Sequence, residues 1–96
     1  MVEKRYILLQ NYCEHSKIED EFIRNLFEYG LISVEKQDNQ EVIHENEISE
    51  IEKLFRLHTD LGINYEGLDV ISEMLKRVRN MEKEMEILRK RLRLYE

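Results

Sequence analysis

The residues of this 96-residue chain best suited to nucleophilic or metal chemistry are Cys13, His15, His44 and His58. Cys13 and His15 are two positions apart, which places them on different sides of a helix, and the other two histidines are distant in sequence. No C-x-x-C, H-E-x-x-H or glycine-rich phosphate loop occurs. The sequence therefore predicts structural roles for these four residues, with no metal, no cofactor and no enzymatic activity. With one cysteine, no internal disulfide is possible.

Charge gives a second group of candidate residues. Residues 1–50 hold 5 Lys and Arg against 12 Asp and Glu, a net charge of −7, whereas residues 51–96 hold 10 against 9, a net charge of +1. Phosphate binding needs clustered cations, so this distribution disfavours nucleic acid as the main ligand. An acidic front half is compatible with a basic protein partner, or with solubility alone.

The segment "LHTDLGINYEGL", residues 57–68, is predicted to form a compact corner between two helices. Gly62 can take the left-handed conformation that ends the first helix, and Ile63 can fold back onto its last turn. Asn64 can cap the second helix, and Gly67 in its first turn allows close backbone approach. All of these roles are structural.

Polar residues next to this corner have two possible roles. Arg56 and Asp60 are four positions apart, so they can pair on one helix face, in the less favourable orientation. Alternatively they are exposed, together with His58, and contact a partner.

Apolar spacing and turn residues predict the elements that position these groups. A short strand near Tyr6 precedes a helix of two turns in residues 10–16 and a clearer helix at residues 19–29, which Gly30 closes. A hairpin around the polar turn "QDNQ" follows, and Asn46 is expected to cap the next helix. The apolar faces are expected at Phe22, Ile23, Leu26 and Phe27 in the earlier helix, and at Ile48, Ile51, Leu54, Phe55 and Leu61 in the later one.

Two short helices followed by a two-stranded wing form a winged helix-turn-helix plan. The fold class predicted is mainly α, a winged helix-turn-helix with a small β-hairpin wing and a long C-terminal helix. Residues 1–68 would form the winged-helix domain and residues 69–96 the long helix, as one structural unit.

The long C-terminal helix carries a heptad pattern. Its apolar positions alternate in steps of three and four: Ile71, Met74, Val78, Met81, Met85, Leu88, Leu92 and Tyr95. In a parallel pair the flanking charges meet as Arg77–Glu82, Glu84–Arg89 and Arg91–Glu96, all opposite in sign. This seam predicts a homodimer, with the helix direction left open. Residues 71–78 could instead pack on their own domain, with Leu68 and Leu75.

Two segments carry a resemblance to a known family. "EFIRNLFEYGLI", residues 21–32, and "LFRLHTDLGINYEGLDVISEML", residues 54–75, resemble the chaperone-modulator family of the CbpM type. That family is an offshoot of the MerR-like winged-helix proteins, and the similarity runs from about residue 6 to residue 92. It implies a MerR-like fold and a protein that binds the J-domain of a DnaJ-like or CbpA-like co-chaperone and inhibits its stimulation of Hsp70.

The resemblance and the charges together suggest a partner-binding surface. Its candidate residues are Glu19, Asp20, Glu21, Glu28, Arg56, His58 and Asp60. The alternative function is a MerR-like DNA-binding transcriptional regulator, and a third is a structural dimerisation module. The helix at residues 19–29 has one cation, Arg24, against four acids, which makes DNA an improbable partner.

Location is predicted from what the chain lacks. No apolar run approaches the roughly 20 residues needed to cross a bilayer, so no membrane association is expected. The apolar stretch near the start, residues 6–9, is too short for a signal peptide. A cytoplasmic protein is expected.

Overall fold

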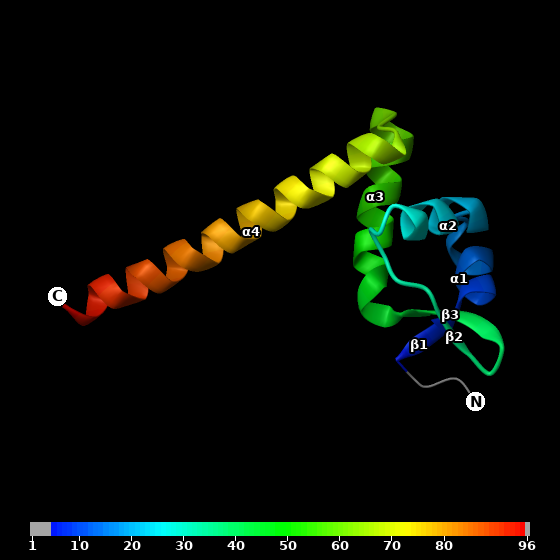
Figure 1. The fold of residues 1–96 in the computed structure, drawn as a ribbon, viewed down its shortest axis with the longest axis horizontal. Coiled ribbons are helices and arrows are strands. Elements are labelled where there is room, and N and C mark those ends of the chain that lie inside the picture. Colours follow the sequence, from blue (N-terminus) through cyan, green and yellow to red (C-terminus); the bar gives the residue numbers. More distant parts are fainter. Residues whose placement is uncertain (1–4, 96) are drawn as a thin grey trace.

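A computed structural model of the protein describes residues 5–95 (Figure 1). In chain order its elements are β1 (Tyr6–Leu8), α1 (Leu9–Ser16), α2 (Asp20–Glu28), β2 (Glu35–Gln37), β3 (Gln40–His44), a 3₁₀ turn η1 (Glu45–Glu47), α3 (Ile48–Leu61) and α4 (Tyr65–Leu94). Helices α1 to α3 and the small sheet form one body, from which α4 projects (Figure 1). The predicted fold class, mainly α with a wing and a long C-terminal helix, is confirmed.

The wing is a type I′ hairpin. β2 and β3 pair antiparallel, from Glu35 opposite Val42 to Gln37 opposite Gln40. The two residues of the turn, Asp38 and Asn39, both have positive φ, 53° and 64°. Asp and Asn tolerate this conformation better than other non-glycine residues, which explains the turn. The predicted hairpin is therefore confirmed, with strands of three and five residues.

The first strand completes the sheet. β1 pairs antiparallel with β3, with Tyr6 opposite His44, so the strand order is β1-β3-β2. The sequence predicted a short strand here without predicting its partner. Val42 and Ile43, at the centre of the sheet, are fully buried.

The core lies between the sheet and the three short helices. Its buried members are Leu9, Tyr12, Ile18, Phe22, Ile23, Leu26, Ile32, Ile43, Ile51, Leu54 and Leu68. Phe27 was expected on the buried face of α2 but is 49% exposed. At 100° per residue it lies 140° from Phe22, beyond the arc of about 100° that a packed helix covers.

Helix α2 ends as its sequence predicts. Gly30 has φ of 73°, its N–H donates to the Phe27 carbonyl at 2.9 Å, and the Leu31 N–H donates to the Leu26 carbonyl at 2.9 Å. These two bonds define a Schellman motif, in which a left-handed glycine satisfies the last carbonyls of the helix.

The start of α3 differs from the prediction. Asn46 lies in the 3₁₀ turn, and its backbone N–H donates to His44 Nδ1 at 3.1 Å. The helix begins two residues later without a side-chain cap. The cause is the sheet, whose pairing continues to Glu45, where the N–H donates to the Arg5 carbonyl at 2.8 Å. At the other end of the helix Leu61, an expected core position, is 69% exposed.

The corner between α3 and α4 is built as predicted. Gly62 has φ of 66° and ends α3. Asn64 Oδ1 accepts the Gly67 N–H at 2.8 Å, which caps α4. Ile63 packs partly buried against the core, and its carbonyl accepts a bond of 2.7 Å from His58 Nδ1.

Only the beginning of α4 contacts the domain. Leu68 and Ser72 are buried, and Leu75 is half-buried. The helix is continuous across the predicted boundary between residues 68 and 69. Beyond this contact it extends away from the body (Figure 1). The predicted pair Arg91–Glu96 involves a residue, Glu96, that lies outside the described residues 5–95.

Candidate partner-binding surface

A pocket of about 290 Å³ lies where the start of α2, the last turns of α3 and the start of α4 meet. We call it the aromatic pocket. Its lining residues are Lys17, Glu19, Glu21, Phe22, Phe55, His58, Thr59 and Tyr65. The pocket therefore brings together Glu19, Glu21 and His58, three of the predicted partner-binding residues, which come from segments more than 30 residues apart.

Ring contacts hold the wall of the aromatic pocket. Phe22 meets Phe55 edge-on at 5.3 Å between ring centroids and lies 5.4 Å from His58. His58 stacks on Tyr65 at 5.0 Å, and Tyr65 stacks on Tyr29 at 5.9 Å. Each such pair contributes about 0.5–1.5 kcal/mol beyond its buried area. These contacts between the rings therefore stabilise the wall of the pocket without a bound ligand.

His58 has a defined tautomer in this arrangement. Its Nδ1 lies 2.7 Å from the Ile63 carbonyl oxygen. A carbonyl can only accept, so Nδ1 carries the hydrogen, and Nε2 of the neutral ring holds a lone pair. His58 therefore stabilises the corner and also lines the pocket.

Asp20, the third acid at the start of α2, belongs to a different contact. Arg24 Nε donates to Asp20 Oδ2 at 2.6 Å, and its two terminal nitrogens bond Glu41 of the wing at 2.6 and 3.1 Å. The bonds to Glu41 and to Asp20 raise the pKa of the Arg24 guanidinium, and the bond from Arg24 lowers the pKa of Glu41. This tie between helix and wing was not predicted, because the sequence gives no register for a contact 17 residues away.

A wider cleft of about 920 Å³ lies on the other side of α2, between α1 and the wing. Cys13 and the Arg24–Glu41 tie line it. Burial raises the pKa of the Cys13 thiol, which makes it a poor thiolate nucleophile.

The remaining predicted site residues lie outside both hollows. Glu28, Arg56 and Asp60 are exposed. The Arg56–Asp60 ion pair, one of the two alternatives for these residues, does not form in the described part of the chain. The Thr59 hydroxyl, which donates to the Phe55 carbonyl at 2.9 Å, also lies 3.3 Å from Asp60 Oδ1, which places the Asp60 carboxylate beside a pocket residue.

Tyr29 forms a contact with α4 that the sequence did not predict. Its hydroxyl donates to Glu66 Oε1 at 2.6 Å, linking the end of α2 to the start of α4. The bond lowers the pKa of Glu66 and raises that of Tyr29. A tyrosine just before the glycine that ends a helix gave no signal of this role.

Within residues 5–95, no three His, Cys, Asp or Glu side chains gather closely enough to hold a metal ion. None of the helices in the described range has both the length and the apolarity to span a membrane.

Comparison with known proteins identifies the fold family. The family model described as "MerR HTH family regulatory protein" matches residues 7–90. The chain belongs to this MerR family. A search among curated proteins gave no significant match.

Family membership assigns a role to α2. In helix-turn-helix proteins that bind DNA, the second helix of the motif enters the major groove. In this MerR-family chain that helix is α2, and its one cation, Arg24, is bound to two carboxylates. Its other charged residues, Glu19, Glu21 and Glu28, are all acids, and none of them forms an ion pair within residues 5–95.

The long helix of this MerR-family chain also presents an unpartnered seam. From Met74 to Leu92 the side chains at the heptad positions are between 47% and 63% exposed, and Tyr95 is 90% exposed. Ile71, the first of them, is half-buried. The alternative in which residues 71–78 pack on their own domain therefore fails at Met74 and Val78, which are 60% and 47% exposed.

Proposed function

We propose that this MerR-family protein is a non-enzymatic regulator that binds the J-domain of a DnaJ-like or CbpA-like co-chaperone and inhibits its stimulation of Hsp70. The observation that carries the proposal is the charge of α2, whose one cation is neutralised by Asp20 and by Glu41 of the wing. The class of partner follows from the chaperone-modulator resemblance of residues 21–32 and 54–75.

Charge complementarity supports this pairing. The resemblance implies a J-domain with a basic helix, which is the surface that contacts Hsp70. A protein that covers this helix with an acidic face competes with Hsp70 directly. Surface charges of opposite sign mostly accelerate the encounter and set its specificity. Glu19 and Glu21 are both exposed at the start of α2 and available for this contact.

The experiment is a binding measurement with a purified DnaJ-like J-domain over a series of salt concentrations, together with an assay of J-domain-stimulated Hsp70 ATPase activity. We expect an affinity that falls as salt rises and a loss of stimulation when the protein is added.

Charge reversal of Asp20 and Glu21 to Lys should slow association more than it accelerates dissociation. Arg56 or Asp60 variants should accelerate dissociation if those residues lie inside the contact.

The control is Glu86→Lys, which reverses one carboxylate on the distant part of α4, half the charge change of the double variant. It should leave the association rate nearly unchanged. Affinity that is independent of salt would show that the acidic face is not the docking surface. Absence of any J-domain binding would overturn the proposed function.

The proposal includes a homodimer formed along α4. The exposed seam from Met74 to Tyr95 covers about 30 Å of helix at 1.5 Å per residue. An exposed apolar stripe of this length is costly to leave in water, and a second copy of the same helix buries it. The winged-helix bodies would then lie outside the seam, free to bind one J-domain each.

A further inference from the structure

We infer that the aromatic pocket binds the cationic side chain, Arg or Lys, of a basic protein partner. The partner's identity as a J-domain rests on the proposed function, whereas the choice of a cation rests on the chemistry of the pocket alone.

The first support is the wall of the aromatic pocket. Four rings, those of Phe22, Phe55, His58 and Tyr65, line a volume of about 290 Å³. Aromatic faces carry negative partial charge and attract a cation within about 6 Å of the ring centroid. The long apolar stem of Arg or Lys suits the same surface, since such side chains bury their methylene groups while the charged end meets polar partners.

The second support is the charge at the rim. Glu19 and Glu21 line the pocket directly, and the Asp60 carboxylate lies 3.3 Å from the hydroxyl of Thr59, another lining residue. For none of these three acids does the structure of residues 5–95 give an ion-pair partner. The helix ends at the pocket are the positive starts of α2 and α4 and the negative end of α3, so the preference for a cation comes from the rim carboxylates and not from the helix dipoles. The balance favours a positively charged ligand.

The third support is His58. Its Nδ1–H is committed to the Ile63 carbonyl at 2.7 Å. In the neutral ring the remaining nitrogen, Nε2, is an acceptor, and no bond to it exists in the described part of the chain. An Arg or Lys side chain carries only donors, so it can bond this acceptor, whereas an acid cannot.

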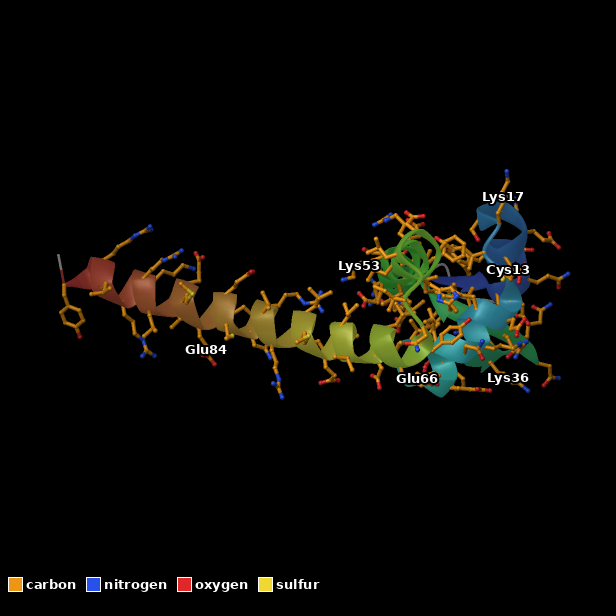
Figure 2. All side chains as sticks on the ribbon, turned by 90° about the horizontal axis from the view of Figure 1, so that it is seen from above. Cys13, Lys17, Lys36, Lys53, Glu66 and Glu84 are labelled. Carbon is orange, nitrogen blue, oxygen red and sulfur yellow. The ribbon has the colours of Figure 1, made fainter. Side chains whose placement is uncertain are left out.

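Among residues 5–95, Lys17 is the one Lys or Arg that lines the pocket. It follows α1 with a left-handed φ of 66°. Figure 2 shows its side chain extending outward from the body. The Lys17 side chain therefore does not fill the pocket, but its positive charge at the rim repels a bound cation.

The test begins with a small probe. N-acetylarginine methylamide is titrated into isotopically labelled full-length protein and followed by NMR, with the neutral isostere N-acetylcitrulline methylamide as the control. We expect millimolar binding of the arginine compound, with the largest shifts at Phe22, Phe55, His58 and Tyr65. Equal shifts from the citrulline compound, or shifts confined to other regions, would overturn the inference.

Charge variants then test whether the residues that line the pocket attract the probe. Glu21→Gln should weaken the arginine compound roughly two- to tenfold. Glu28→Gln removes the same charge from the same helix outside the pocket and should have little effect. Lys17→Asn, which suits the left-handed backbone, should tighten binding. Equal effects of Glu21→Gln and Glu28→Gln would mean that general charge, not the pocket, attracts the probe.

Aromatic variants test the ring wall. Phe55→Leu should weaken the probe, and Phe27→Leu, an exposed ring on α2 outside the pocket, should not. Because Phe55 also packs on the core, thermal unfolding of both variants is measured. If Phe55→Leu does not fold, the Glu21→Gln and Lys17→Asn comparison still decides the inference, since both residues are exposed.

The same variants separate this inference from the proposed function. If the arginine compound binds the pocket and no J-domain binds, the cation site stands and the proposed partner is wrong. If a J-domain binds and Glu21→Gln behaves as Glu28→Gln does toward it, the proposed function stands and the inference is overturned.

Discussion

At the corner between α3 and α4, three residues each provide a different feature that the backbone requires there. Gly62 supplies a positive φ of 66°, Asn64 accepts the Gly67 N–H at 2.8 Å, and Gly67 leaves room for both neighbours. A Cβ at Gly67 would lie 2.8 Å from Ile63 Cγ2 and 3.1 Å from Asn64 Oδ1. The direction in which α4 leaves the domain depends on these residues.

Substitution at the corner should destabilise the fold. Gly62→Val is expected to cost more than about 1 kcal/mol of unfolding free energy, because a β-branched residue resists positive φ. Asn64→Ala should cost about 1 kcal/mol through the lost cap. Chemical denaturation measures both. The matched control is Asn46→Ala. The sequence predicted a cap here, but the change should be nearly neutral, since within residues 5–95 Asn46 bonds through its backbone and not through its side chain.

Gly67→Ala sets two effects against each other. Alanine is a better helix former than glycine by about 1 kcal/mol. The new methyl group, however, meets the branched Ile63 side chain, which is held against the core. We expect net destabilisation in denaturation experiments. In an Ile63→Ala background the same change should become neutral or stabilising, and identical effects in both backgrounds would show that the contact is relieved by a backbone shift.

At the scale of elements, α2 and the wing are joined through Arg24. A cation that could contact phosphate is instead bonded to Asp20 and, through two nitrogens, to Glu41. The tie links the two elements that a winged helix-turn-helix would present to a duplex. The tie connects the two elements at the surface and offsets the positive charge of the helix.

The acidic α2 predicts weak DNA binding. We expect no sequence-specific, salt-resistant duplex binding by the protein, because phosphates are repelled by Glu19, Glu21 and Glu28. A gel-shift assay at physiological salt is the measurement. Nanomolar binding to a defined duplex would contradict the prediction and favour a DNA-binding regulator.

The Arg24–Glu41 tie also predicts a pH dependence. The bond from Arg24 lowers the pKa of Glu41 below its ordinary value of 4.5. The pair therefore contributes stability above the unfolded pKa and loses it as the pH falls through the lowered folded value. An NMR titration of the Glu41 carboxyl should have its midpoint below 4.5, and Arg24→Gln should raise it. If the midpoint of the Glu41 titration is the same in Arg24→Gln, the bond from Arg24 is not the cause of the lowered pKa.

At the scale of the whole molecule, α4 extends far from the body that positions the aromatic pocket (Figure 2). The helix has 30 residues, and its buried residues, Leu68 and Ser72, both lie within the first eight. Pocket and seam are thus separated in space, so changes in one should leave the other intact.

The seam predicts that self-association can be removed without unfolding the winged-helix body. Replacing Met85 and Leu88 with Lys should abolish the dimer while the winged-helix body stays folded, because two cations in an apolar seam are costly to bury. Light scattering gives the mass, with and without a J-domain, and circular dichroism follows the fold. Ile87→Lys is the matched control, an exposed apolar residue off the seam. A double variant that keeps the dimer mass would exclude the seam as the dimer contact.

The sequence by itself determined the elements and the corner, because these depend on local interactions. Helical spacing, a polar turn, Gly30, Gly62 and Asn64 act within a few residues along the chain. Such signals placed α2, the wing hairpin and the capped start of α4 correctly. They failed at Asn46, because His44 and Glu45 just before it are held by Tyr6 and Arg5, and sheet pairing is a long-range contact.

The tertiary structure alone decided which acids work together. In sequence, Glu19, Asp20 and Glu21 form one cluster, but in the structure Arg24 joins Asp20 to Glu41 of the wing, whereas Glu19 and Glu21 line the aromatic pocket with His58. Neighbouring positions on a helix are 100° apart, so adjacent charges face different surfaces. What lies opposite each surface depends on how α2 packs against α3 and the wing. That packing created the aromatic pocket, and no spacing in the sequence specifies it.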